Sequence, residues 1–316
     1  MNVLIVGAGL IGSSTAWRLA QAGARVTLTD AGRFGGETSS AGAGMLAPGG
    51  EFAGPSVWFD LGVDGMRMYP DFVDELHAEA GMPIDFALCG CRHFMAAAEA
   101  QARATFQSAH GIQVELTPGG LFYPDAGFVD PTDMLRALRC AIQARGVAIV
   151  EHQPVSELEA SQHDAVVIAA GAWSQQVRVT FHGQPLMLPP VKPIKGHLVG
   201  FDLAPGSLGP MLRRGHTYVL QRSNGFTIAG STEEDAGFDR SVSVGTCEHI
   251  HRAAAELFPA LEQATPSKCW IGFRPYSTEP HIGQVKGTNV WLAYGHFRNG
   301  ILLAPLTAAR IAGQIL

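Results

Sequence analysis

The sequence predicts an α/β protein in which a parallel strand–helix–strand unit is interleaved along the chain with an antiparallel sheet. Three observations lead to this fold class. The chain opens with a β-branched strand, a glycine-rich turn and a helix; a further helix and two strands follow at residues 130–171; and residues 176–267 alternate between short strands and turns. With 316 residues, 47% of them hydrophobic, the chain can bury one large core or two ordinary ones.

The composition describes a compact globular protein and excludes several classes of partner. Charged residues make up 16% of the chain and the net charge is −6, with no cluster of basic residues, so we expect no nucleic-acid partner. The five cysteines lack C-x-x-C spacing, which indicates reduced thiols of a cytoplasmic protein and no metal site. The apolar N-terminus has no basic region before it, and no apolar run reaches the roughly 20 residues of a transmembrane helix.

The first thirty residues have the pattern of a Rossmann-type nucleotide-binding unit. Residues 3–6, VLIV, predict a buried parallel strand, and GAGLIG at 7–12 follows at once. A helix is expected over 13–23 and a second strand over 24–29, which ends at Asp30. A glycine-rich turn alone is a weak signal, but here the strands, the helix and the terminal acid all agree with it.

Each residue of this pattern has a physical role in holding a dinucleotide. Gly7 permits the tight turn, Gly9 allows backbone N–H groups to approach a pyrophosphate, and Gly12 packs helix against strand. The helix N-terminus favours the negative phosphates. Asp30 is placed to accept the ribose hydroxyls and disfavours a 2′-phosphate, so we expect NAD or FAD rather than NADP.

A loop of small residues, TSSAGAGMLAP at 38–48, follows where an NAD-binding fold would usually continue into another strand and helix. Its hydroxyls and small side chains could bring backbone amides against a ligand. A flexible surface loop has the same composition. The residues themselves leave both interpretations open.

The remaining elements are marked by turns and caps. We expect a helix over 61–80 that is interrupted near Pro70, and a helix capped by Asp130. Strands are expected at VAIVEH and DAVVIAAG. Beyond them come HLVGF, TYVLQ and FTIAG, the last two joined by a turn at 223–225, and a helix near 246–263.

Several polar side chains stand in apolar surroundings. Arg274 lies in CWIGFRP, where a surface salt bridge and a buried guanidinium that needs an anion are the alternatives. The polar turn at 296–299 precedes an apolar C-terminal helix and either faces a ligand or is an ordinary first turn; His296 there could simply pack in the core. Lys195 is a further pocket candidate, and Arg222 is expected to be structural or a surface charge.

Five motifs give the chain a family resemblance: GGETSSAGAGMLAP, GLFYPDAGFVDPTDML, DAVVIAAGAWS, WIGFRPYSTEPHIG and GHFRNGILLAP. In this order they resemble the D-amino-acid-oxidase-like flavoproteins, and most of all the glycine-oxidising branch that serves thiamine biosynthesis. The resemblance implies a Rossmann-like FAD-binding domain interleaved with an antiparallel-sheet substrate domain. The FAD-binding domain would comprise 1–80, 126–175 and 268–316, and the substrate domain 81–125 and 176–267.

The resemblance also implies which residues hold the FAD. The ADP half would be bound by Gly7, Gly9, Leu10, Ile11, Gly12 and Asp30, and the flavin by Ser39, Ser40, Gly42, Ala43, Gly44 and Met45. Val155 would pair its backbone with adenine and Gly171 would approach the pyrophosphate. At the C-terminal helix, backbone N–H groups would come from Arg298, Asn299, Gly300, Ile301 and Leu302.

For the reaction, the resemblance implies that Arg274 and Tyr218 grip a substrate carboxylate while Arg298 bounds the pocket. A small amino acid, with glycine expected, would lose a hydride to flavin N5, and oxygen would accept the electrons to give hydrogen peroxide. The alternatives are a D-amino-acid or N-methyl-amine oxidase or dehydrogenase with another acceptor, and a non-catalytic FAD-binding subunit. A homo-oligomer is compatible with the sequence. The segment after Arg274 is shorter than is usual in these proteins.

Overall fold

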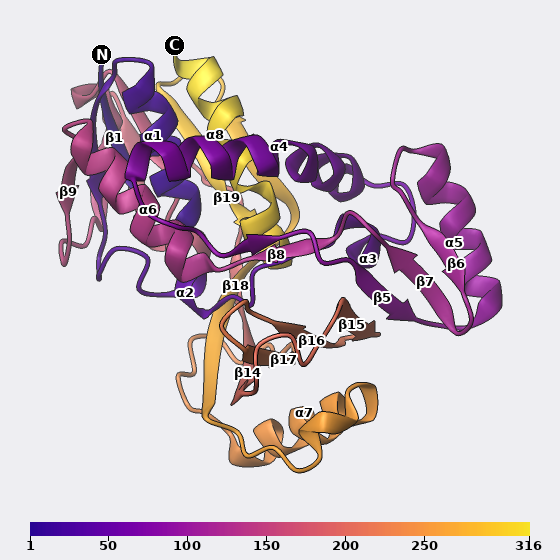
Figure 1. Ribbon diagram of the computed structural model, residues 1–316. Coiled ribbons are helices and arrows are strands. Elements are labelled where there is room, and N and C mark those ends of the chain that lie inside the picture. Colours follow the sequence, from indigo (N-terminus) through magenta and orange to yellow (C-terminus); the bar gives the residue numbers. More distant parts are fainter.

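The computed structural model describes residues 1–316, and a single sheet of thirteen strands runs through the molecule (Figure 1). From one edge to the other the strands are β6 (Glu115–Thr117), β7 (Gly120–Tyr123), β5 (Cys91–Phe94), β15 (Met211–Arg214), β16 (Thr217–Gln221), β17 (Phe226–Gly230), β14 (Lys192–Asp202), β18 (Lys268–Gln284), β19 (Val290–His296), β11 (Ala165–Ile168), β1 (Asn2–Val6), β2 (Arg25–Thr29) and β9 (Ala148–Val150). The sheet is mixed, as the sequence predicts.

The last five strands of this order are parallel and form the nucleotide-binding half. In the register, Val3 lies opposite Val26 on one side and Ala165 on the other. These strands are buried because helices cover one face and a small sheet covers the other. The helices are α1 (Leu10–Gln21), α4 (Val57–Ala80), α6 (Pro131–Ala144) and α8 (Gly300–Ile315). The small sheet contains β10 (Glu157–Glu159), β12 (Arg178–Phe181) and β13 (Gln184–Pro185).

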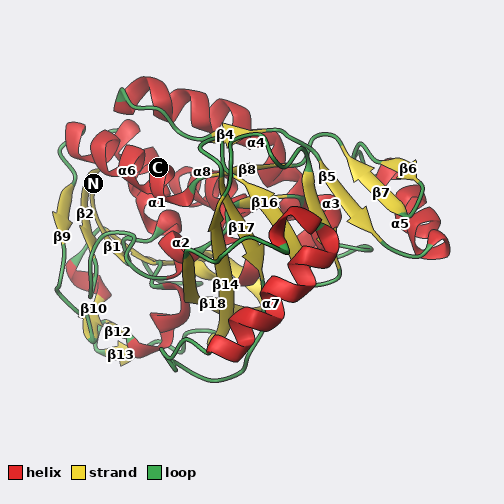
Figure 2. Ribbon diagram, turned by 60° about the horizontal axis from the view of Figure 1, so that its bottom comes forward, coloured by secondary structure: helices red, strands yellow, loops and turns green.

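The antiparallel half contains β14 to β17 and the first part of β18. Helix α7 (Val244–Leu257) packs across β14 and β16 and lies in front of them in Figure 2. Helix α5 (Ala97–Ala109) packs on β6 and β7, at the right of Figure 1. A second small sheet is formed by β3 (Met45–Leu46), β8 (Gly127–Val129) and β4 (Phe86–Ala87).

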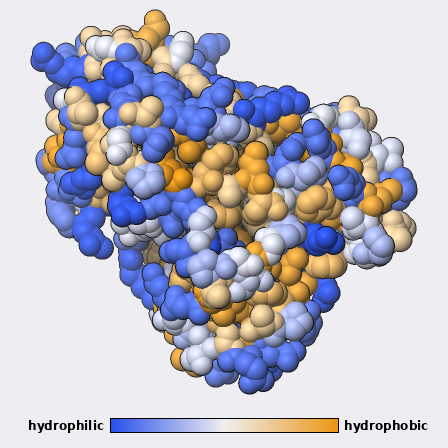
Figure 3. Space-filling view, viewed as in Figure 1, coloured by the Kyte–Doolittle hydropathy of each residue, from blue (hydrophilic) through white to orange (hydrophobic).

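Strand β18 joins the two halves. Its first part pairs with β14, from Lys268 opposite Gly200 to Tyr276 opposite Lys192. After a register shift between Tyr276 and His281, its second part pairs with β19. The expected division into two interleaved domains stays a prediction: the sheet is continuous through β18, while the apolar side chains gather in separate clusters on the two halves. Figure 3 shows hydrophobic residues at the centre of the visible face, between the upper body and the lower lobe.

Some local predictions are confirmed and others are wrong. Asp130 caps α6 by accepting the Thr132 N–H at 2.7 Å, and Gly81 ends α4 with φ +65°, as expected. The expected interruption at Pro70 is wrong, because the 24-residue helix α4 runs through this proline without a break. The loop at 38–48 is partly helical, with α2 (Thr38–Ala41) and α3 (Pro48–Glu51). Helix α7 ends at Leu257, short of the expected 263.

Helix α8 also contains a proline in its interior, and α4 compensates for it. Pro305 has no N–H to donate to the carbonyl of Ile301, four residues earlier. The hydroxyl of Tyr69 on α4 donates to that carbonyl instead, at 2.8 Å. The helices can approach closely because Gly65 has no side chain: a Cβ there would lie 2.6 Å from the Leu302 oxygen. These contacts fix the start of α8 relative to the sheet.

Candidate active site

A cavity of about 620 Å³ lies between the two halves. Nearly all of the residues expected at the site line it, although they come from segments that are far apart in the sequence. They are Gly7, Gly9, Leu10, Ile11, Asp30, Ser39, Gly42, Ala43, Gly44, Met45, Val155, Gly171, Tyr218, Arg274, Arg298, Asn299, Gly300, Ile301 and Leu302. Two of the residues that the resemblance implies at the site do not line it. Gly12 lies beneath the glycine-rich turn, and Ser40 lines a smaller neighbouring cavity.

Two glycines of the glycine-rich turn, Gly7 and Gly12, are packed too tightly for any side chain. Gly7 has φ +108°, and a Cβ there would lie 2.4 Å from the Ala169 oxygen. A Cβ on Gly12 would lie 1.9 Å from the Gly7 oxygen, so Gly12 serves the packing of α1 against β1. Gly9 is the N-cap of α1 and contributes no side chain to the cavity. The backbone is therefore free to approach a ligand there.

Asp30 lies at the end of β2 and organises the turns around the nucleotide end of the cavity. Its Oδ2 accepts the Ala8 N–H at 2.7 Å and its Oδ1 accepts the Gly32 N–H at 2.8 Å. Each carboxylate oxygen has a second acceptor position, so ribose hydroxyls can still bind. Gln153 is held nearby through its carbonyl, which accepts the Thr29 hydroxyl at 3.2 Å, and Val155 follows on the cavity wall.

The segment 38–48 is fixed by its neighbours and is not a flexible surface loop. Ser39 accepts the Leu10 N–H at 2.9 Å, which joins the loop to the start of α1. Arg222 is buried and donates to the carbonyls of Ala43 and Val129, the latter at 3.0 Å. Gly44 has φ +84°, and a Cβ there would lie 2.0 Å from the Val129 oxygen. Of the two interpretations of Arg222, a structural residue or a surface charge, the first is confirmed.

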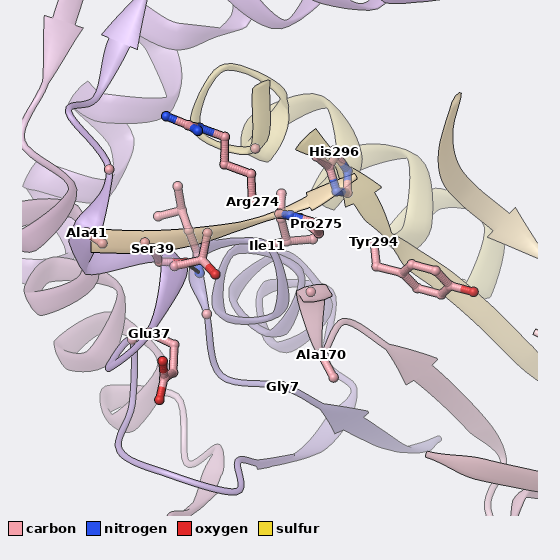
Figure 4. A pocket seen from close by; sticks show the side chains of 18 of the residues that line it. Gly7, Ile11, Glu37, Ser39, Ala41, Ala170, Arg274, Pro275, Tyr294 and His296 are labelled. Atoms are coloured by element: carbon pink, nitrogen blue, oxygen red, sulfur yellow. Dashed lines mark hydrogen bonds between the residues drawn. The ribbon is translucent and has the colours of Figure 1, made fainter. Parts of the chain in front are cut away.

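Arg274 extends from β18 into the cavity, on the opposite side of the strand from Gly7 and Ala170 (Figure 4). Its Nη1 donates to the Thr232 carbonyl and its Nη2 to the Ser231 hydroxyl, both at 2.8 Å. No carboxylate lies within 4 Å of it. Burial lowers the pKa of Arg274, as expected for a cation without a counter-ion. The surface salt bridge considered for this residue is therefore absent.

Tyr218 lies beside Arg274 and is held by the neighbouring strand. It stands opposite Gly230 in the pairing of β16 with β17, and a Cβ on Gly230 would lie 2.6 Å from its hydroxyl. Only 6% of Tyr218 is exposed. Burial raises the pKa of the Tyr218 hydroxyl, so that it stays protonated and can donate a hydrogen bond.

Arg298 lines the cavity just before α8, and two carboxylates hold it. Its Nε lies 3.1 Å from Oε2 of Glu51, and its Nη1 donates to Glu233. Glu51, which also accepts a hydrogen bond from Arg213, was not predicted from the sequence. The available signal was a lone acid directly after the small-residue loop, in GMLAPGGE.

The N-terminus of α8 faces the cavity and is not capped by a side chain. Asn299 is the N-cap and makes no side-chain hydrogen bond to the helix. The helix dipole favours negative charge there, and backbone N–H groups of the first turn can face a ligand. His296 lines the same region but is buried, with its Nε2 3.0 Å from the Thr307 hydroxyl.

Lys195 does not belong to the site. It is 2% exposed and lies outside the cavity wall, where its ammonium pairs with Asp239 at 2.6 Å. The expectation that it might enter the pocket is wrong because its alternating position on β14 directs it to Asp239 rather than to the cavity. Its neighbour Gly196 instead packs against Arg274.

This fold and site define a dinucleotide-dependent oxidoreductase: a glycine-rich turn and a helix start frame one end of the cavity, and an uncompensated arginine stands at the other. The cavity fits FAD, because Gly9 at the start of α1 leaves room for the pyrophosphate and the uncapped start of α8 can face the flavin ring. The chain belongs to the family of FAD-dependent oxidoreductases, which it matches over residues 2–314. The cofactor is FAD, and the choice left open by the glycine motif is settled.

Known proteins with similar sequences cover the whole chain. A glycine oxidase of Pseudomonas putida is 30% identical over 96% of this chain and 91% of its own length. A bifunctional protein ThiO/ThiG of Synechocystis is 31% identical over the full chain, which spans 51% of that protein. The solved structure of glycine oxidase from Geobacillus kaustophilus is 28% identical, with a TM-score of 0.90 over 99% of this chain and 94% of that one. None of the helices is both long and apolar enough to span a bilayer.

Proposed function

We propose that this protein is an FAD-dependent amino acid oxidase that deaminates a small amino acid, with glycine as the expected substrate. One observation carries the proposal: Arg274 is a cavity arginine whose hydrogen-bond partners are neutral oxygens, Thr232 O and Ser231 Oγ. A guanidinium in this position can bind a carboxylate through two parallel hydrogen bonds. The relatives named glycine oxidase support the same substrate class.

The protein's part in the reaction is to bind and orient the substrate. Arg274 would hold the carboxylate, and the protonated hydroxyl of Tyr218 would donate a further hydrogen bond to it. With the carboxylate fixed at two positions, the Cα of the substrate is held at a defined place in the cavity. When bound, FAD would supply the two-electron redox chemistry, with oxygen as the final acceptor and hydrogen peroxide as its product.

The start of α8 would stabilise negative charge on the cofactor side. Residues Asn299 to Leu302 lie on the cavity wall, and no side chain caps this helix start. A helix N-terminus favours an anion by roughly 0.3–1 kcal/mol at an exposed site and by more when it is partly buried. Arg298 bounds this part of the cavity while engaged with Glu51 and Glu233.

The visible spectrum of the purified holoprotein, recorded without oxygen before and after the addition of glycine, tests the function. We expect yellow flavin bands that bleach with glycine. Flavin bands that do not respond to glycine would reject this substrate and direct the search to D-amino acids and N-methyl amines. A holoprotein that no amine reduces would leave the non-catalytic FAD-binding subunit as the better description. If glycine does bleach the flavin bands, release of hydrogen peroxide in air would identify oxygen as the electron acceptor.

A further inference from the structure

A carboxylate, Glu51, lies in the substrate end of the cavity between two guanidiniums. It ends helix α3, and 15% of its side chain is exposed. Oε1 accepts a hydrogen bond from Arg213, and Oε2 lies 3.1 Å from Nε of Arg298. A buried carboxylate is costly unless its charge is compensated. The two arginines provide that compensation, which leaves open what a carboxylate contributes to a cavity that binds an anionic substrate.

The charges of this cluster cancel. Arg298 also donates to Glu233, so two arginines face two carboxylates. Burial alone would raise the pKa of Glu51, but Arg298 and Arg213 bring it to about 2, and the carboxyl is ionised at neutral pH. Burial alone would lower the pKa of Arg298, but Glu51 and Glu233 raise it overall. Neither cation of the cluster is free for a ligand.

Arg274 is the one cation of this region that is left without a counter-ion. Its two partners, Thr232 O and Ser231 Oγ, carry no charge. The charges of Arg298, Glu233 and Glu51 all act on its guanidinium, so these groups share one electrostatic environment. The substrate end of the cavity therefore carries a single net positive charge.

We propose that Glu51 is a specificity-determining residue, which keeps this net charge at one and so selects compounds with one carboxylate over compounds with two. The proposal rests on the proposed function, since Arg274 must bind the first carboxylate. A second carboxylate of the ligand would find Arg298 already paired with Glu51 and Glu233. It would also be repelled by the negative charges of these two glutamates. Loss of the Glu51 charge would free Arg298 to bind it.

Acetate and malonate are suitable probes because they differ by one carboxylate and have no amine to be oxidised. Their dissociation constants can be measured from the change in the flavin absorption of the holoenzyme. We expect the wild type to bind acetate more tightly than malonate. In Glu51→Gln the ratio of the two constants should shift toward malonate by about tenfold or more. Glu51→Asp keeps the charge and should keep the wild-type order.

Two further variants make the test independent of the folding of Glu51→Gln. Glu233→Gln removes the other negative charge from a more exposed position, and it should shift the ratio in the same direction. Glu256→Gln is the matched control, because this carboxylate on α7 is 74% exposed and lies outside the cavity wall; its ratio should stay unchanged.

The outcomes separate the two proposals. If the ratio of the acetate and malonate dissociation constants stays at its wild-type value in both Glu51→Gln and Glu233→Gln, the role of Glu51 is overturned. The carboxylate site of Arg274 is left intact by that result. An equal shift in Glu256→Gln overturns it as well, because the effect would then come from the total charge of the protein. A wild-type holoenzyme that binds neither acid would reject the carboxylate site itself, and the role of Glu51 with it.

Discussion

Substitution of Gly196 by alanine would move the Arg274 guanidinium without removing its charge. Gly196 lies on β14, opposite Gly272 of β18, and its missing side chain makes room for Arg274. A Cβ at this position would lie 2.3 Å from Nη1 and 2.6 Å from Nη2, whereas ordinary contacts begin at 3.4 Å. Since the strand backbone is fixed by its neighbours, the guanidinium must retreat by roughly 1 Å.

A shift of this size is enough to disrupt substrate binding. The bonds from Arg274 to Thr232 and Ser231 are 2.8 Å long, and a displacement of about 1 Å disturbs their geometry together with the position of the guanidinium. Hydrogen bonds to charged groups contribute about 1.5–3 kcal/mol each. The loss of one such bond to the substrate carboxylate corresponds to an increase in Kd of about tenfold or more.

The assay is the Kd of acetate, read from the flavin absorption of the holoenzyme. Gly209→Ala is the control, because a Cβ at Gly209 meets no atom within 4 Å. We expect a higher Kd in Gly196→Ala only, with the flavin bands retained. A folded Gly196→Ala holoenzyme that binds acetate like the wild type would refute the assignment of Arg274 as the carboxylate-binding residue.

Three other predictions concern Tyr218, Tyr69 and His296. Tyr218→Phe should raise KM about 2- to 10-fold, the equivalent of one neutral hydrogen bond, at unchanged Tm; an unaltered KM removes the hydroxyl from the site. Tyr69→Phe leaves the Ile301 carbonyl without its 2.8 Å partner at an estimated cost of about 1–3 kcal/mol, so Tm should fall by several degrees, whereas Tyr276→Phe, at an exposed position, should not change it. Burial lowers the pKa of His296 from 6.5 to about 3. The unfolded chain therefore takes up this proton first, and stability to urea should decrease as the pH falls below 6.5; His296→Gln should make the decrease shallower, and an identical slope would contradict the assignment.

The parts of the fold that depend on local chemistry could be predicted from the sequence. The turn at Gly7 requires positive φ, the cap at Asp130 requires a side-chain acceptor, and both appear as short motifs. Pro70 shows the limit of such rules, because the packing of the 24-residue helix α4 against α6 and α8 outweighs the cost of a proline in its interior.

The candidate site was predictable where a motif carried it and not where it depended on tertiary contacts. Arg298 could be located from its segment, but its two partners could not, because Glu51 is 247 residues away and Glu233 is 65 residues away. The same reason applies to Lys195, whose partner Asp239 lies on a distant loop. Charge pairing of this kind becomes visible only when the strands have been placed.

The topology of β18 and its neighbours has a consequence for biosynthesis. Strand β1 is made about 160 residues before its partner β11, and β18, β19 and α8 follow more than 100 residues after β11. Because the walls that carry Arg274 and Asn299 are made so long after β1, a nascent chain has no complete site for a cofactor until they too have left the ribosome. FAD capture should therefore wait for β19 and α8, and the cell must tolerate an open, unpaired sheet edge until then.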